Sequence, residues 1–64
     1  MYAARINAVN KTLRQTSDKL ATIAGELIDD RYAWQMINES IQAIHEAIDM
    51  NNSTIAQISN NQLK

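Results

Sequence analysis

The 64-residue chain lacks cysteine and proline and has a single glycine, Gly25. Without cysteine it forms neither a disulfide nor a thiolate metal site. The scarcity of proline and glycine removes the residues on which most β-turns depend, so we expect an all-α fold. A chain this short buries little surface by itself and is too small to build an enzyme with a buried cleft. We therefore expect a protein that is not an enzyme and that needs a partner.

Charge and hydropathy exclude further classes of function. The net charge is −1, which argues against nucleic acid as the main partner. No apolar run approaches the ~18–20 residues of a membrane span and no signal peptide is visible, so we expect no direct membrane insertion by this segment. His45 and Asp49 have helical i, i+4 spacing, but two ligands are too few for a closed metal site. No catalytic residues, metal or cofactor are predicted.

Apolar residues recur in a seven-residue repeat, abcdefg, when Ile6 is taken as position a. Fourteen of the twenty apolar residues other than alanine occupy positions a and d. A repeat this narrow and this long is typical of a coiled coil. It predicts one continuous helix over residues 1–64, about 95 Å long at 1.5 Å per residue, as a fragment of a larger protein. The predicted core residues are Ile6, Val9, Leu13, Leu20, Ile23, Leu27, Trp34, Ile37, Ile41, Ile44, Ile48, Ile55 and Ile58.

Polar residues interrupt the apolar repeat at Thr16, Asp30, Asn51 and Gln62. A buried asparagine such as Asn51 fixes register and strand number at some cost in stability. Asp30 is harder to place, because a parallel trimer would gather three carboxylates at its axis. It is a solvated defect of the coiled coil, an acid-sensitive switch, or part of a turn.

A helical hairpin that associates as a four-helix bundle is the alternative fold. Gly25 is unfavourable in a helix interior, and Asp29 and Asp30 lie near the middle of the chain, where a turn would go. The first half is also mainly basic and the second mainly acidic, so an antiparallel fold would pair opposite charges. The continuous heptad phase across residues 27–34 favours the single helix.

The choice of residues at a and d predicts how many chains associate. The second half has isoleucine at both positions, which favours three strands, and the first half has leucine at a, which favours four. We expect a parallel homotrimer, with a tetramer as the other possibility. Most e and g residues are small, so a second helix or strand could pack in the grooves beside the core. A stripe of Ile28, Tyr32 and Met36 at a spacing of four is either ordinary surface or a second partner-binding site.

The long heptad with isoleucine and leucine inside and small residues beside it, over residues 9–27 and 37–58, resembles the first heptad repeat of class I viral fusion proteins. That resemblance implies a central trimer at the virion surface or outside the cell, with a second heptad repeat packed into its grooves. The chain departs from the family in lacking a fusion peptide and a second repeat. Asn10, Asn38 and Asn52 also begin glycosylation motifs at e positions, where a glycan would block the groove.

Two further resemblances accompany the two folds. Residues 48–58, with Asn51 at d, are similar to the stalks of trimeric bacterial adhesins and phage fibres. The hairpin alternative resembles small plasmid copy-number regulators of the four-helix type, which bind RNA. We therefore predict a structural oligomerisation rod, such as the central coiled coil of a membrane-fusion glycoprotein or a fibre stalk. The alternative is a cytoplasmic helical-hairpin dimer that acts as a regulatory protein-binding module.

Overall fold

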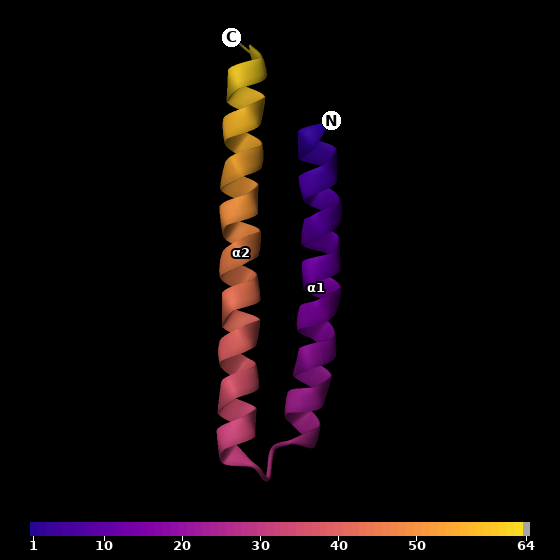
Figure 1. Ribbon diagram of the computed structural model, residues 1–64, viewed down its shortest axis with the longest axis vertical. Helices are drawn as coiled ribbons and strands as arrows, with labels where there is room; N and C mark the ends of the chain where they lie inside the picture. The colour runs from indigo at the N-terminus through magenta and orange to yellow at the C-terminus, as the bar shows by residue number, and fades with distance from the viewer. Residues whose placement is uncertain (64) are drawn as a thin grey trace.

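Over residues 1–63 the chain folds into two antiparallel α-helices (Figure 1). The computed structural model describes residues 1–63, with the side chains of residues 1–61, and contains α1 (Tyr2–Glu26) and α2 (Arg31–Leu63). No strand occurs among residues 1–63, so the predicted all-α class is confirmed. The structure does not contain the continuous helix predicted for residues 1–64, because the chain reverses between the two helices. It has the hairpin of the alternative prediction, and the number of associating chains stays a prediction.

The reversal results from local capping chemistry at Leu27–Asp30. The N–H of Leu27 still donates to the carbonyls of Ile23 and Ala24, both at 3.1 Å, and closes α1. The N–H of Asp30 then donates back to the Leu27 carbonyl at 2.9 Å. The Asp30 carboxylate accepts a hydrogen bond from the N–H of Ala33 at 3.1 Å, and so acts as the N-cap of α2. Asp30 is thus an exposed cap rather than a layer of a coiled-coil axis.

Gly25 lies within α1 and not in the turn. Its φ is negative, and no residue among 1–63 has a positive φ, so the turn does not depend on glycine. A Cβ built on Gly25 would meet nothing within 4 Å. The helix therefore ends because Asp30 begins a new one, and not because glycine breaks it.

The two helices use different rows of the heptad to pack on each other. In α2 the covered residues are mainly at a and d, and Ile48 is 7% exposed. In α1 the covered rows are a and e instead: large residues at Ile6, Leu13 and Leu20, followed by Leu27 at the C-cap, and small ones at Ala3, Asn10, Ser17 and Ala24. The d row of α1 is consequently turned out of the interface.

The hairpin is a single layer of two helices lying side by side, and it therefore exposes much of its surface. Its Cα atoms extend over 54 × 15 × 9 Å. Its accessible surface is 5098 Å², whereas a compact folded protein of this mass exposes about 4,100 Å². Among the described hydrophobic side chains only Ala24 and Ile48 are buried. The single chain thus leaves roughly 1,000 Å² more surface in water than a compact monomer would.

Candidate interaction surface

A network of three asparagines joins the helices near the open end of the hairpin. Asn10, which is 1% exposed, donates from Nδ2 to Oδ1 of Asn52 at 3.1 Å. Asn51 in turn donates from its Nδ2 to Oδ1 of Asn10 at 2.9 Å. The buried amide of Asn10 is thereby satisfied on both sides, which is what an amide inside a helix interface requires. No buried side-chain nitrogen or oxygen of the described residues lacks a hydrogen-bond partner.

A second polar pair lies nearer the turn. The hydroxyl of Ser17, a residue 6% exposed, is 3.1 Å from Nε2 of the exposed His45. Together with the Asn10–Asn52 bond, this contact shows that the e row of α1 faces the e row of α2. On this side of the hairpin the b row of α1 lies beside the e row of α2, and we call it the polar face: Asn7, Arg14 and Ala21 of α1, and Asn38, His45, Asn52 and Ser59 of α2. A shallow groove on this face is lined by Arg14, His45, Ile48 and Asp49.

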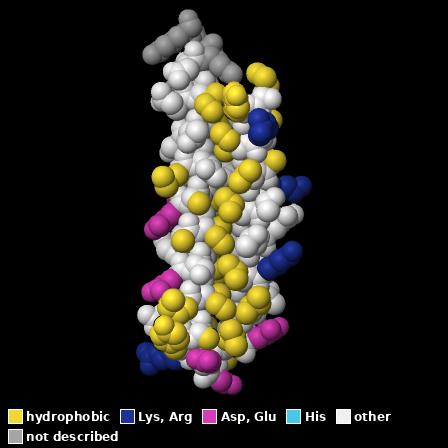
Figure 2. Space-filling view, viewed as in Figure 1, with side chains coloured by type: hydrophobic (Ala, Val, Ile, Leu, Met, Phe, Trp, Pro, Cys, Tyr) yellow, Lys and Arg dark blue, Asp and Glu magenta, His cyan; other side chains and the backbone are white. Residues whose placement is uncertain are grey.

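The opposite side carries no charged residue in its two central rows. We call it the uncharged face: Tyr2, Val9, Thr16 and Ile23 from the d row of α1, and Ala33, Ser40, Ala47 and Thr54 from the g row of α2. Figure 2 views the hairpin from this side and shows a lengthwise column of apolar side chains between the helices, with charged side chains along the edges. Tyr2, Val9 and Ile23 are 69%, 52% and 43% exposed. This is an unusual exposure for side chains that repeat every seven residues along a helix.

The serine and threonine hydroxyls of the uncharged face are already paired within their own helices. Thr16 donates to the carbonyl of Thr12 at 3.0 Å, Ser40 to that of Met36 at 3.2 Å, and Thr54 to that of Met50 at 3.0 Å. Covering these residues with another surface would not leave a hydroxyl donor unpaired. The desolvation cost that usually opposes burial of polar side chains is therefore small on this face.

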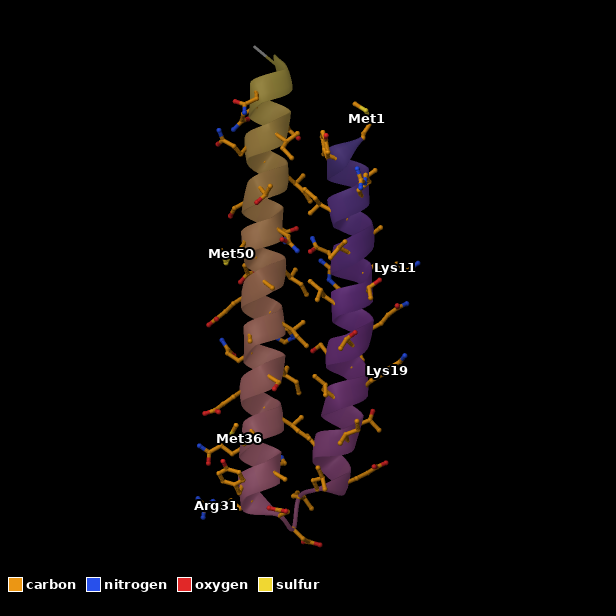
Figure 3. The ribbon with its side chains drawn as sticks, in the orientation of Figure 1. Met1, Lys11, Lys19, Arg31, Met36 and Met50 are labelled. Carbon is orange, nitrogen blue, oxygen red and sulfur yellow. The ribbon has the colours of Figure 1, made fainter. Side chains whose placement is uncertain are left out.

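Charged side chains lie at the outer edges of the hairpin, and their signs differ between the helices. α1 contains four basic and two acidic residues, and α2 contains one basic and three acidic residues. Figure 3 shows Lys11 and Lys19 pointing outward from α1, and Met36 and Met50 outward from α2. At the open end, the guanidinium carbon of Arg5 lies 5.8 Å from the centre of the Tyr2 ring. The hairpin is thus positive along one edge and negative along the other.

The structure divides the thirteen predicted core residues into two groups. Ten are at least partly covered in the interface between α1 and α2, whereas Val9, Ile23 and Trp34 are exposed. Val9 and Ile23 are exposed because α1 buries its a and e rows in place of a and d. Trp34 is 42% exposed in the first turn of α2.

The residues predicted to form polar layers of a coiled coil lie in different parts of the hairpin and do not line a common axis. Thr16 is exposed on the uncharged face, Asn51 lies in the interface, and Asp30 caps α2. The side chain of Gln62 lies outside the described residues. In the predicted stripe, Ile28 is in the turn, while Tyr32 and Met36 are on the outer side of α2, and they are 69%, 76% and 46% exposed.

Sequence reasoning missed the contribution of Asn10, Ser17 and Asn52 to the interface. All three stand at e, where small polar residues look like ordinary surface. The signal that points to them is the regular spacing of small residues at 3, 10, 17 and 24, which lets a second helix approach closely.

No group of three or more His, Cys, Asp or Glu side chains among the described residues is arranged to hold a metal ion. Neither helix, over the residues described, has the length and apolar character that crossing a membrane requires.

No model of a protein family matches the chain, and no curated protein or solved structure is significantly similar to it. A functional assignment therefore has to rest on the two faces of the hairpin.

Proposed function

We propose that the chain is a self-associating helical-hairpin module, a non-catalytic protein that acts by pairing two copies through the uncharged face. The observation that carries the proposal is the exposed d row of α1, with Val9 and Ile23 in water. An apolar row flanked by hydroxyls that are already paired is favourable to bury and costs little to desolvate.

The size of the exposed surface supports association. The hairpin has about 1,000 Å² of surface beyond that of a compact protein of its mass, and a standard protein–protein interface covers about 800 Å² on each partner. A backbone outline of 54 × 15 Å gives the face an area of that order. One interface of ordinary size would thus bring the exposed surface close to that of a compact fold.

The chemistry of the face favours a second copy as the partner. Its α1 row has large residues such as Val9 and Ile23, and its α2 row has small ones such as Ala33 and Ala47. Each copy therefore supplies both the projecting and the receding half of a surface, as an isologous two-fold interface requires. The product would be a four-helix bundle.

Sedimentation equilibrium tests the proposal directly. The chain at micromolar concentration should have twice its mass of 7.2 kDa. Substituting both Val9→Ser and Ile23→Ser should weaken dimerisation at least ten-fold, because each copy loses two apolar contacts, and helicity by circular dichroism should be retained. A matched control is Tyr32→Ser with Met50→Ser, since these residues of α2 are 76% and 71% exposed and belong to neither row of the uncharged face. A one-chain mass at high concentration, or equal weakening by the control pair, would contradict the proposal.

The trimeric rod remains a second candidate because the heptad phase is unbroken from Leu27 to Trp34. Straightening the turn would align the a and d rows of both helices on one face, and such a helix would need to associate with parallel copies. The same measurement separates the two proposals: three chains of extended shape would favour the rod, and two chains of hairpin length would favour the bundle.

A further inference from the structure

We propose that the two hairpins pair with their turns at the same end, so that α1 of each copy lies on α2 of the other. This inference rests on the proposed function, since it concerns the orientation within that dimer. A two-fold axis parallel to the helices gives this arrangement. A two-fold axis perpendicular to them would put the turns at opposite ends and lay α1 on α1 and α2 on α2.

The first argument is the match of large with small residues at each level of the hairpin. The Ser17–His45 and Asn10–Asn52 contacts each join two residues whose numbers add up to 62. A residue of α1 and a residue of α2 with that sum therefore lie at the same height along the hairpin. On the uncharged face, three pairs of residues lie at the same height to within one residue. They are Ile23 with Ser40, Thr16 with Ala47, and Val9 with Thr54. An axis parallel to the helices preserves these levels between copies.

With the turns together, the projecting row of each α1 meets the receding row of the other copy's α2. Ile23 then lies over Ser40, and Val9 over the methyl-bearing Thr54, whose hydroxyl is already bonded to the Met50 carbonyl. With the turns opposed, the large rows of both copies would meet each other, and the small rows would face each other across a gap. Close packing at an interface core therefore favours the turns together.

The second argument is charge. α1 has two more basic than acidic residues, and α2 has two more acidic than basic ones. With the turns together, each positive helix lies on a negative one. Lys19 is then level with residue 43 of the second copy, between its Glu39 and Glu46. With the turns opposed, the two positive helices would lie together, as would the two negative ones, and like charges across an interface select against that orientation.

The orientation has a consequence for function. The turn is at one end of the hairpin, and residues 1 and 63 are both toward the other end (Figure 1). With the turns together, the open ends of both hairpins are adjacent. The dimer would then bring together at that end whatever either helix is joined to.

Distances between spin labels test the orientation, and the absence of native cysteine makes single labelling sites simple to introduce. A label at Asp29→Cys reports on the turn, where Asp29 is exposed. Turns at the same end should give a separation below half the 54 Å length of the hairpin, and opposed turns a separation close to that full length. The matched control is Met50→Cys, an exposed site on the outer side of α2 that reports dimer formation in either orientation. Mass and helicity of both labelled variants are measured in parallel.

Each outcome decides the question. A short Asp29 separation in an assembly of two chains supports the inference. A long Asp29 separation with a Met50 signal and a two-chain mass overturns the orientation and leaves the proposed function standing. A one-chain mass with no dipolar signal at either site overturns both, and an assembly of three chains overturns both in favour of the rod.

Discussion

Asn51 donates a 2.9 Å hydrogen bond to Asn10, a residue 41 positions away in the sequence and 1% exposed. The bond holds the two helices at one relative level, because sliding either helix would leave the amide of Asn10 buried without a partner. An unpaired buried amide costs more than the bond itself contributes. The asparagine network therefore specifies the alignment of the hairpin.

The first prediction concerns this network. Asn51→Ile should lower the free energy of unfolding by about 1–2 kcal/mol, since it removes the donor to the buried Asn10 oxygen. Adding Asn10→Leu should recover most of the loss, because no polar group is then left unpaired. Urea denaturation of the three proteins measures the coupling. Asn7→Ala serves as the control with a smaller effect, because Asn7 is exposed to water and lies outside the network. A more stable Asn51→Ile variant would contradict the network.

The second prediction concerns Gly25, which lies in α1 with a negative φ and open space where a Cβ would go. Gly25→Ala should stabilise the hairpin by about 0.5–1 kcal/mol, because alanine loses less conformational entropy on entering a helix. The reverse substitution at an exposed helical site, Ala21→Gly, should cost about as much. Thermal denaturation of both variants checks the pair. Destabilisation by Gly25→Ala would mean that the last turn of α1 is not helical.

Much of this fold could be predicted from the pattern of residues. The absence of proline and cysteine and the regular apolar rows predict helices, and Asn51 stands out as a residue that sets alignment. The break between the helices could not be found from periodicity, because the four residues Leu27–Asp30 happen to keep the heptad phase. The signal for the break is chemical: aspartate at position 30 has the side chain that an N-cap needs.

The candidate surface was harder to predict for a different reason. An a/d pattern does not say which flanking row a helix buries with its a row. In α1 the small residues at e, such as Ser17 and Ala24, allow a closer approach of α2 than Thr16 and Ile23 at d would. Which row is buried depends on how well its side chains fit the surface of the neighbouring helix, and the heptad pattern holds no information about that fit.

The third prediction tests whether small residues set this rotation of α1. Ser17→Leu should destabilise the hairpin by about 1–3 kcal/mol, because Ser17 is 6% exposed and a larger side chain would overpack the interface. Ser17→Ala should change stability by less than about 1 kcal/mol, since His45 is exposed and water can replace the lost bond. Denaturation in urea separates the two effects. Equal tolerance of leucine and alanine would show that the e row is not in the interface.

The last prediction concerns Asp30, whose carboxylate accepts the N–H of Ala33 at 3.1 Å. Asp30→Ala should cost about 1 kcal/mol, because α2 loses its N-cap, whereas Asp30→Asn or Asp30→Ser should cost much less, because both side chains cap well. The matched control is Asp29→Ala, which removes an equal charge from the adjacent exposed position without removing the cap. Thermal denaturation at neutral pH gives the four values.

Asp30→Ile distinguishes the hairpin from the rod in the same experiment. In the hairpin isoleucine cannot cap α2, so the substitution should destabilise the protein at least as much as alanine does. In a continuous parallel trimer it would replace three repelling carboxylates with an apolar layer and should stabilise the assembly near neutral pH. The mass of the variant is measured by sedimentation together with its melting temperature. A rise in both would mean that the turn had straightened, because an apolar side chain at this position favours a continuous coiled coil and provides no cap for a second helix.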